Sequence, residues 1–496
     1  MIERLAADSR ACAPGVAFVA YPGEAADGRA HIADALRRGC AAVLWEAENF
    51  AWRADWRVPN AQVKGLRGQA GSLANAFYGR PSEAMWMCGV TGTNGKTSCS
   101  QWIAALLGAE GEQAAVIGTL GAGFPGSDAG LAPLVNTTPG AIELHALLDG
   151  LRRKGARAVA IEVSSHALVQ ERVNGVAFDC ALFTNLSHDH LDYHGSMDVY
   201  AEAKARLFDM PGLAAAVLNL DDVRGVQFAQ RLAGRGARTI GYTLSPSAIV
   251  QGSVTEFIAA RDIRIAGDAM HVTLESSWGG ARTVIRQLGR YSVSNALGVL
   301  GCLVAHGVRF ADAAARLADL PAVPGRMQQL GGDGCPLVVV DYAHTPDALE
   351  KVLHALRPAA AARGGALVAV FGAGGDRDSS KRPLLGRVAA QFADRVVLTS
   401  DNPRSEDPLA ILAAIESGVG EAMGGTMRRC ALEPDRARAI EAAIRGAAAG
   451  DVVLIAGKGH ETYQEAAGRR VPFSDVEVAG AALTRWQERG RPGGAA

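Results

Sequence analysis

A glycine-rich segment is the strongest chemical signal in this 496-residue sequence. It reads Gly-Val-Thr-Gly-Thr-Asn-Gly-Lys-Thr over 89–97, after an apolar run that predicts a strand and before a stretch that predicts a helix. Glycines let backbone N–H groups turn toward phosphate oxygens, Lys96 can neutralise phosphate charge, and the Thr97 hydroxyl can ligate Mg²⁺. We therefore predict an ATP site, although the strict P-loop spacing asks for glycine where Val90 stands.

Two further polar clusters follow predicted strands. Glu162–His166 comes directly after the apolar run 158–161, where a carboxylate can hold the metal of a nucleotide. Taken alone, this cluster is better explained by a capping acid at Glu162 and a packed histidine at His166. The segment Thr184–Gly195 holds three histidines and two aspartates but lacks the H-E-x-x-H spacing of hydrolytic zinc sites. Its oxygen-rich composition favours Mg²⁺ with one histidine ligand.

The elements that position these clusters belong to the α/β class, because short β-branched runs alternate with Ala/Leu-rich stretches almost throughout. We expect three domains. A small N-terminal α/β domain covers 1–87, and a central P-loop-type ATPase domain with a mostly parallel sheet covers 88–327. The pattern breaks at Val323–Arg326, and a C-terminal Rossmann-like α/β domain covers 328–496.

Composition and charge exclude several classes of protein. The formal net charge of -1 argues against a nucleic-acid-binding protein, which needs a basic excess. No apolar run approaches the ~20 residues of a membrane-spanning helix, and charges interrupt the N-terminus where a secretory signal needs an apolar core. The eight cysteines show no C-x-x-C pair and no grouping typical of metal ligands. We expect reduced thiols in a cytoplasmic protein without membrane insertion.

Taken together, the motifs resemble those of the Mur ligases of peptidoglycan synthesis, and the resemblance spans nearly the whole chain. Its first part consists of Gly92–Thr97, Asn136–Pro139, Glu162–His166, Asp189–His194, Ala203–Lys204, Gly289–Asn295 and Gly325–Met327. Its second part, which resembles the branch of the family that adds meso-2,6-diaminopimelate to a UDP-linked muramoyl dipeptide, consists of Asp341–Pro346, Gly374–Asp378, Asp401–Arg404 and Gly457–Glu461.

The resemblance implies an ATP-dependent, amide-forming ligase with ATP and Mg²⁺ as cofactors, small-molecule substrates only, and a monomeric state. The implied catalytic residues are Lys96, Glu162, His190 and Lys204; the implied metal ligands are Thr97, Glu162, His190 and Lys204 as a carbamate. The implied ATP-binding residues are Gly92, Thr93, Asn94, Gly95, Lys96, Thr97, Ser98, Asn295, Arg326 and Asp341. The implied UDP-substrate residues are Ala7, Ser9, Glu24, Ala25, Ala26, Asn136, Thr137, Thr138, Ser164, Gln170 and Arg172. The implied amino-acid-binding residues are Arg377, Asp401, Asn402, Pro403, Arg404, Gly457 and Glu461.

Other functions stay open at this point. An L-lysine-adding ligase shares the family's motifs, but the Asp401–Arg404 string argues against it. A folylpolyglutamate synthase-like enzyme lacks a first domain of about 85 residues ahead of the phosphate loop. A nucleotide switch that binds partners through its third domain explains the phosphate loop and leaves the C-terminal motifs without a purpose.

Overall fold

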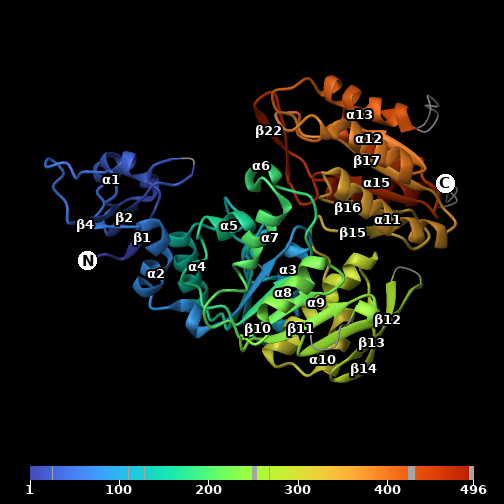
Figure 1. The fold of residues 1–496 in the computed structure, drawn as a ribbon. Helices are drawn as coiled ribbons and strands as arrows, with labels where there is room; N and C mark the ends of the chain where they lie inside the picture. Colours follow the sequence, from blue (N-terminus) through green and yellow to red (C-terminus); the bar gives the residue numbers. More distant parts are fainter. Residues whose placement is uncertain are drawn as a thin grey trace. The chain divides into compact units, whose positions relative to one another are not determined.

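The computed structural model describes residues 1–24, 26–109, 111–127, 129–248, 254–266, 269–422 and 430–490 (Figure 1). Ala25, one of the predicted substrate residues, lies outside this part of the chain. The chain forms two compact units, which are described separately. Unit 1 comprises residues 1–259, 275–279 and 297–313, and unit 2 comprises 260–274, 280–296 and 314–496.

The N-terminal part of unit 1 is a small parallel sheet between helices. Its strands, in sheet order, are β1 (Arg4–Ala6), β2 (Val16–Ala20), β3 (Ala42–Glu46) and β4 (Asn60–Val63). Successive side chains of the buried strand β2 pack on opposite faces of the sheet. Val19 packs toward Leu66 of α2 (Leu66–Phe77), whereas Phe18 packs toward Ile32 of α1 (Ile32–Arg37). This alternation is what a sheet covered on both faces requires.

A larger, mostly parallel sheet follows, in the order β14-β13-β12-β11-β10-β9-β5-β8-β6-β7. Its strands are β5 (Trp86–Thr91), β6 (Ala114–Gly118), β7 (Gly121–Gly123), β8 (Ala158–Glu162), β9 (Cys180–Phe183), β10 (Ala215–Asn219), β11 (Arg238–Thr243), β12 (Glu256–Ala266), β13 (Ala269–Ser276) and β14 (Gly279–Ile285). The helices in this stretch are α3 (Lys96–Gly108), α4 (Ala141–Arg153), α5 (Ser165–Val169), α6 (Leu191–His194), α7 (Met197–Ala205), α8 (Val223–Leu232), α9 (Arg290–His306) and α10 (Phe310–Arg316).

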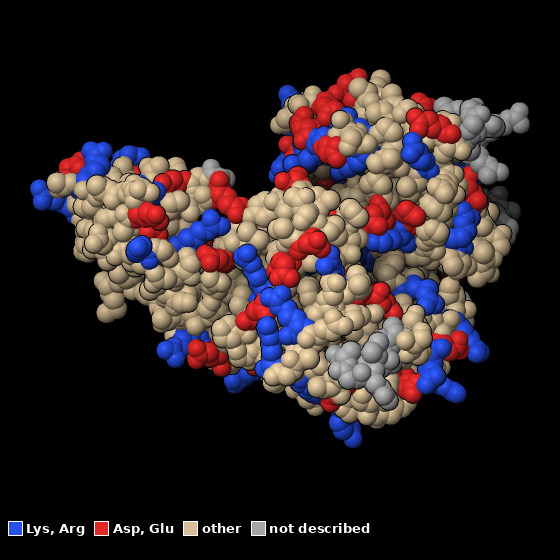
Figure 2. Space-filling view, in the orientation of Figure 1, with Lys and Arg blue, Asp and Glu red and all other residues tan. Residues whose placement is uncertain are grey.

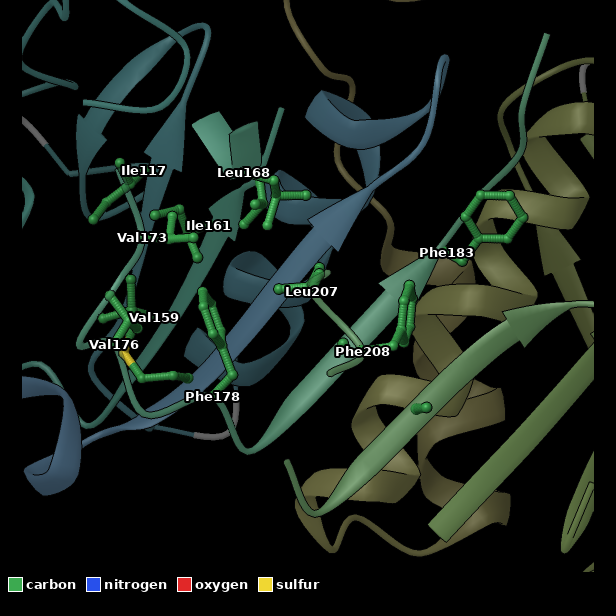
Figure 3. Close-up of a cluster of buried hydrophobic side chains, with 14 of the residues drawn as sticks. Ile117, Val159, Ile161, Leu168, Val173, Val176, Phe178, Phe183, Leu207 and Phe208 are labelled. Atoms are coloured by element: carbon green, nitrogen blue, oxygen red, sulfur yellow. The ribbon is translucent and has the colours of Figure 1, made fainter. Parts of the chain in front are cut away.

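The core of unit 1 shows why these strands lie at its centre. Val159, Ile161 and Phe183 point from β8 and β9 to one face, where they pack with Leu168 of α5 and with Phe208 (Figure 3). Strands that are buried on both faces consist of near-continuous apolar residues, which is the pattern of β5, β8 and β9. The carboxyl ends of these three neighbouring parallel strands therefore lie at one edge of the sheet.

Unit 2 carries a second sheet, in the order β15-β16-β20-β17-β18-β19, and only the β15–β16 pair is antiparallel. Its strands are β15 (Gln328–Gly331), β16 (Leu337–Asp341), β17 (Leu367–Phe371), β18 (Arg395–Leu398), β19 (Cys430–Leu432) and β20 (Val452–Ala456); β21 (Tyr463–Ala466) and β22 (Arg469–Pro472) form a hairpin. The helices are α11 (Pro346–Ala362), α12 (Lys381–Phe392), α13 (Pro408–Ala422), α14 (Arg436–Arg445) and α15 (Asp475–Gly490).

Helices cover both faces of this second sheet. Val339 and Leu454 pack with the apolar residues of α11, α12 and α13, whereas Val338 and Val453, one position away, pack with those of α14 and α15. The two sheets confirm the predicted α/β class with mostly parallel sheets. The exact domain bounds stay a prediction.

Two surface and core features bear on the expected class of protein. Figure 2 shows acidic and basic side chains interspersed on the face that it draws, which fits the formal net charge of -1. None of the described helices is long and apolar enough to span a membrane. The cysteines are free, and Cys88, Cys180 and Cys302, which show no common spacing in the sequence, converge in the core of unit 1. Residues far apart in sequence meet there because β5, β9 and α9 pack together.

Candidate active site

The glycine-rich loop leaves the carboxyl end of β5 and enters α3, which is where doubly wound sheets bind their ligands. Gly92 has φ 146° and Gly95 has φ 86°, so both adopt conformations that favour glycine. A Cβ on Gly92 would lie 1.9 Å from Thr184 Oγ1. The Thr184 hydroxyl in turn donates a 2.6 Å hydrogen bond to the Asn94 carbonyl oxygen. Thr184, at the end of β9, therefore contacts the loop directly. Ser98, another predicted ATP-binding residue, lies in the first turn of α3.

Two lysines meet at this loop. Lys96 Nζ donates to the carbonyl oxygens of Gly92 and Thr93 over 2.9 and 2.8 Å. Lys204 Nζ, from α7, donates to the same Gly92 oxygen over 2.8 Å and lies 4.4 Å from the centroid of the Tyr200 ring. Lys204 is 1% exposed. Burial, with a contribution from the nearby Lys96 charge, holds the pKa of Lys204 well below its usual range.

Glu162 ends β8 beside the loop and is buried. Its Oε2 accepts a 3.0 Å hydrogen bond from the Thr97 hydroxyl, and its Oε1 accepts a 2.8 Å bond from the Thr119 backbone N–H. The Thr119 hydroxyl also donates to Oε2 over 3.2 Å. The structure thus brings together Thr97 and Glu162, as predicted. Sequence analysis missed Thr119, which follows the end of β6 and carries no motif.

His190 lies at the start of α6 with a left-handed backbone, φ 54°. Its Nε2 is 3.5 Å from Asp189 Oδ2, and its ring centroid is 4.9 Å from that of His166. Burial lowers the pKa of His190, and the charges of Lys96 and Lys204 lower it further, against the opposing effect of Asp189. His190 is therefore favoured as a neutral imidazole, the form that ligates metals.

Several predicted UDP-substrate residues form one hydrogen-bonded group next to Glu162. The Thr138 hydroxyl donates to the Glu162 carbonyl oxygen over 2.8 Å and accepts from the Ser164 backbone N–H over 3.1 Å. Arg172 donates to the Thr138 carbonyl oxygen over 2.9 Å and to the Gln170 side-chain oxygen. Thr137 joins the group through its hydroxyl, 3.1 Å from that of Thr119.

The remaining predicted substrate residues are more scattered. Glu24 accepts hydrogen bonds from the Tyr193 hydroxyl, 2.5 Å, and from Gln170 Nε2, 2.6 Å, so its loop reaches the same group. The Ser9 hydroxyl donates to Asp34 Oδ2 over 2.8 Å. Ala7 lies two residues before Ser9 in the chain. The Ala26 carbonyl oxygen accepts a 2.8 Å hydrogen bond from the Gly23 backbone N–H. Asn136 is exposed.

In unit 2, the predicted nucleotide residues Arg326 and Asp341 border the first two strands of the second sheet, and a third, Asn295, lies in α9. Asp341 ends β16 and accepts 2.8 Å hydrogen bonds from the backbone N–H groups of Met327 and Ala343. The Arg326 guanidinium lies 4.6 Å from the centroid of the Tyr342 ring. Burial raises the pKa of Asp341, and the charge of Arg326 opposes this rise. Asn295 is buried in α9.

The predicted amino-acid-binding residues follow the carboxyl ends of three neighbouring strands, β20, β17 and β18. Asn402 Nδ2 donates to Glu461 Oε2 over 2.8 Å. Lys458, which sequence analysis did not single out, is fully buried and donates to Asn402 Oδ1 and Glu461 Oε2 over 3.0 and 2.9 Å. Asp401 Oδ1 lies 3.8 Å from the same ammonium group. The sequence signal that could have singled out Lys458 was its position between Gly457 and Gly459 in the Gly457–Glu461 motif.

Arg404 closes this loop in a left-handed conformation, φ 53°. Its NH1 donates to the Gly375 carbonyl oxygen over 2.6 Å, and its backbone N–H donates to the Glu465 carbonyl oxygen. A Cβ on Gly375 would lie 1.9 Å from the Pro403 carbonyl oxygen, so the two loops touch only because that residue is glycine. Arg377, which lies two residues after Gly375, is exposed.

A buried ion pair supports both amino-acid loops and has no sequence motif. Arg436 on α14 and Asp475 on α15 are fully buried and lie 2.7 Å apart. Arg436 also donates to the carbonyl oxygens of Ser400 and Ala456, the residues immediately before Asp401 and Gly457. The pair therefore fixes the ends of the two strands from which the site loops leave.

The comparisons with known proteins agree with this architecture. Residues 90–303 match the family model "Mur ligase middle domain", residues 325–459 match "Mur ligase, glutamate ligase domain", and residues 1–78 match "Mur ligase family, catalytic domain". A relative from Janthinobacterium sp. (strain Marseille), named UDP-N-acetylmuramoyl-L-alanyl-D-glutamate–2,6-diaminopimelate ligase, is 49% identical over 97% of this chain and 94% of its own. A relative of the same name from Pseudomonas aeruginosa is 48% identical over 98% of this chain and 96% of its own.

A solved structure of a ligase of that name superposes with a TM-score of 0.70 at 35% identity, covering 98% of this chain and 95% of the other. The sequence similarity and the structural similarity each extend over nearly the whole chain. The chain belongs to the Mur ligase family and has that family's three-domain α/β architecture.

Proposed function

We propose that this chain is an ATP-dependent ligase that joins meso-2,6-diaminopimelate to the D-glutamate of UDP-N-acetylmuramoyl-L-alanyl-D-glutamate, in the synthesis of peptidoglycan precursors. The observation that carries this proposal is the Asp401–Arg404 loop, held by Lys458 and Glu461, in a chain 49% identical to a relative named for this reaction. The phosphate loop beside Lys204 and Glu162 supports the use of ATP.

The reaction must overcome the poor electrophilicity of a carboxylate. The γ-phosphoryl group of ATP is transferred to the γ-carboxylate of D-glutamate, which gives an acyl phosphate and ADP. A free amine of diaminopimelate attacks the acyl carbon, and the tetrahedral intermediate collapses to an amide and inorganic phosphate. Lys96 sits in the glycine-rich loop, where a cation stabilises the charge that develops on the transferred phosphoryl group.

The donor set beside this loop fits Mg²⁺. Thr97 and Glu162 offer a hydroxyl and a buried carboxylate that already lie 3.0 Å apart, and hard cations prefer such oxygen ligands. We propose that these two residues hold one Mg²⁺ and that His190 holds a second. When bound, Mg²⁺ supplies positive charge that neutralises phosphate and carboxylate oxygens.

Lys204 fits the carbamate that the family resemblance implies. Carbamate formation needs a neutral amine, and burial favours the neutral form of this group. The nitrogen lone pair attacks carbon dioxide, an N–C bond forms, and one proton leaves to the solvent. The product is an anion, which provides oxygen ligands for a cation where the unmodified side chain offers none.

The substrates have proposed positions in each unit. The group formed by Thr137, Thr138, Ser164, Gln170 and Arg172 is proposed to hold the muramoyl dipeptide, and Asn136, Ala7, Ser9, Glu24 and Ala26 are proposed to extend this binding toward the uridine. Asn295, Arg326 and Asp341 of unit 2 are proposed to bind ATP. We further propose the domain bounds 1–87, 88–327 and 328–496, and a monomer that acts in the cytoplasm on small molecules alone.

Arg404 is proposed to select the amino acid. Diaminopimelate differs from L-lysine by a carboxylate on its far carbon, and a guanidinium can bind a carboxylate with two parallel hydrogen bonds. Arg377 and Glu461 are proposed to bind the other carboxylate and the amine. Asp401, Asn402, Pro403 and Gly457 shape the loops that carry these groups.

Release of ADP measured with each substrate omitted tests the proposal. We expect continuous ADP release only when ATP, the UDP-linked dipeptide and diaminopimelate are all present, because the acyl phosphate forms on the dipeptide and turnover continues only when the amine consumes it. ADP release that is independent of both substrates contradicts the proposal and supports a nucleotide switch. Folate-dependent release in place of dipeptide-dependent release supports a folylpolyglutamate synthase-like enzyme.

A further inference from the structure

Two loops of unit 2 that carry proposed amino-acid-binding residues, 374–377 and 402–406, meet with unusual backbone conformations. Asp376 and Arg404 are not glycines, yet both have a left-handed φ of 53°. Side chains disfavour this region, so such residues persist only where their surroundings fix them. The Ser405 hydroxyl and backbone N–H donate to the two carboxylate oxygens of Asp376 over 2.6 and 3.2 Å. Each loop therefore holds the other in place.

The Gly375 carbonyl oxygen orients the Arg404 guanidinium. It accepts a 2.6 Å hydrogen bond from Arg404 NH1. Among the described residues, the Arg404 side chain makes no other hydrogen bond, so the edge formed by its Nε and NH2 remains for the two oxygens of a carboxylate. A shift of Gly375 turns this edge. The position of one backbone oxygen therefore decides how Arg404 meets a carboxylate.

An ion pair holds the residues on both sides of Gly375. Arg382, in the first turn of α12, donates from NH2 to Glu406 Oε1 over 2.8 Å and to the Gly374 carbonyl oxygen over 3.3 Å. Glu406 Oε1 also accepts a 2.6 Å hydrogen bond from the Asp376 backbone N–H. Gly374 and Asp376 are the direct neighbours of Gly375 in the chain. The pair therefore fixes the backbone segment that presents the Gly375 oxygen.

The packing of α12 fixes Arg382 itself. The Arg382 side chain is 7% exposed, and that of Glu406 is 33% exposed. A Cβ on Gly418 of α13 would lie 1.8 Å from the Pro383 carbonyl oxygen, so the first turn of α12 lies directly against α13. The hydrogen bond from Arg382 lowers the pKa of Glu406, which favours the ionised carboxylate. The loops are therefore attached to a buried cation on a packed helix.

We propose that Arg382 and Glu406 are positioning residues that set the selectivity of this chain for diaminopimelate. They act through the Gly375 carbonyl oxygen and Arg404, and they take no part in the chemical steps. Without the pair, the two loops lose the contact that fixes their spacing, and a misplacement of about 1 Å can cost about 100-fold in rate. This inference rests on the proposed function and adds two residues to the account of its amino-acid site.

Kinetics of Glu406→Ala test the proposal, because this partly exposed side chain can be removed without emptying the core. The KM for diaminopimelate is expected to rise about 10-fold or more, while the KM values for ATP and the UDP-linked dipeptide change less than about 2-fold. The ratio of kcat/KM for diaminopimelate to kcat/KM for L-lysine is expected to fall. Glu406→Gln keeps an acceptor oxygen for both donors and is expected to lose less. A folded Glu406→Ala variant with wild-type KM and selectivity overturns the proposal.

A double-variant cycle with Arg404 separates positioning from a general loss of structure. In an Arg404→Ala background, Glu406→Ala is expected to lower the selectivity ratio no further, because the guanidinium that the pair orients is absent. An equal fold-loss in both backgrounds overturns the proposal. Arg382→Met is expected to behave like Glu406→Ala. Arg387→Met and Glu421→Ala are matched controls, because they break another α12–α13 ion pair, 2.6 Å long, and both are expected to keep wild-type selectivity.

The wild type, measured in the same assay, separates this inference from the proposed function. A wild type that prefers L-lysine contradicts the proposed function, and the inference falls with it. A wild type that prefers diaminopimelate, together with unchanged selectivity in Glu406→Ala, leaves the proposed function standing and overturns the inference alone.

Discussion

Lys96 and Lys204 donate hydrogen bonds to the same acceptor, the carbonyl oxygen of Gly92, over 2.9 and 2.8 Å. Two ammonium groups so close together repel each other, and Lys204 is in addition buried. The lower pKa of Lys204 is the direct result of that burial and of the neighbouring charge. The two lysines therefore differ: Lys96 is proposed to bind phosphate, and Lys204 is available as a neutral amine.

Replacement of Lys204 tests the carbamate. Lys204→Ala is expected to lower the ligation rate by at least about 100-fold, as the loss of a preorganised charged group does. Added formate or acetate is expected to restore part of the rate by supplying the missing carboxylate. The measurement is ligation rate against carboxylate concentration, together with ¹³C NMR of the wild type in ¹³CO₂. An unmodified Lys204 in active, substrate-bound enzyme contradicts this account.

Lys96→Ala is expected to lower the rate of ligation about 100-fold or more at saturating ATP, because the charge that faces the transferred phosphoryl group is lost. The melting temperature is expected to change little, since Lys96 is half-buried and donates to two backbone carbonyls of its own loop. Lys64→Ala, which removes an exposed lysine, is the matched control. Near-normal turnover of the Lys96 variant counts against the ATP site.

Arg404→Ala is expected to raise the KM for diaminopimelate. It is also expected to reduce the ratio of kcat/KM for diaminopimelate to kcat/KM for L-lysine. A site built for a polar group rejects an analogue that lacks it by about 10⁴-fold or more, because its own polar group is left unpaired. The readout is kcat/KM for both amino acids. Arg469→Ala removes an exposed arginine of β22 and is expected to keep wild-type selectivity. Full selectivity in the Arg404 variant means that another residue binds the carboxylate that distinguishes diaminopimelate from L-lysine.

The Arg436–Asp475 pair predicts a large effect on stability. Arg436→Met or Asp475→Asn is expected to lower the free energy of unfolding by about 3–5 kcal/mol, because each leaves a buried partner uncompensated. The double variant is expected to lose less than the sum of the two single losses. Urea unfolding of all four proteins measures this coupling. Strictly additive losses would show that the two side chains do not act as a pair.

His460 predicts how stability responds to acid. Burial, with a contribution from Arg326, lowers the pKa of His460 to about 4. Between pH 6.5 and pH 4 the unfolded chain binds a proton here that the folded chain does not, so stability falls as the pH falls. The wild type is expected to lose of order 1 kcal/mol more than His460→Asn across this window. Denaturant unfolding at pH 7 and at pH 4.5 gives the loss in free energy of unfolding for each protein. Equal losses in the wild type and in His460→Asn contradict the prediction.

The sequence predicted the elements that carry chemistry better than it predicted their supports. The phosphate loop, Glu162 and the Asp401–Arg404 loop carry motifs because their chemistry restricts residue type and spacing. Thr119, Lys458 and the Arg436–Asp475 pair act through hydrogen-bond partners up to 56 residues away in the sequence. Such contacts exist only once strands from separate segments are neighbours, and the same is true of the three converging cysteines.

The central claim is tested most directly by the product itself. The purified chain is incubated with ATP, Mg²⁺, UDP-N-acetylmuramoyl-L-alanyl-D-glutamate and an equal mixture of meso-diaminopimelate and L-lysine, and the nucleotide products are resolved by mass spectrometry. The account predicts one dominant product, the tripeptide nucleotide that carries diaminopimelate, formed together with one ADP per amide. A product that carries mainly lysine, or ADP without any amide, contradicts it.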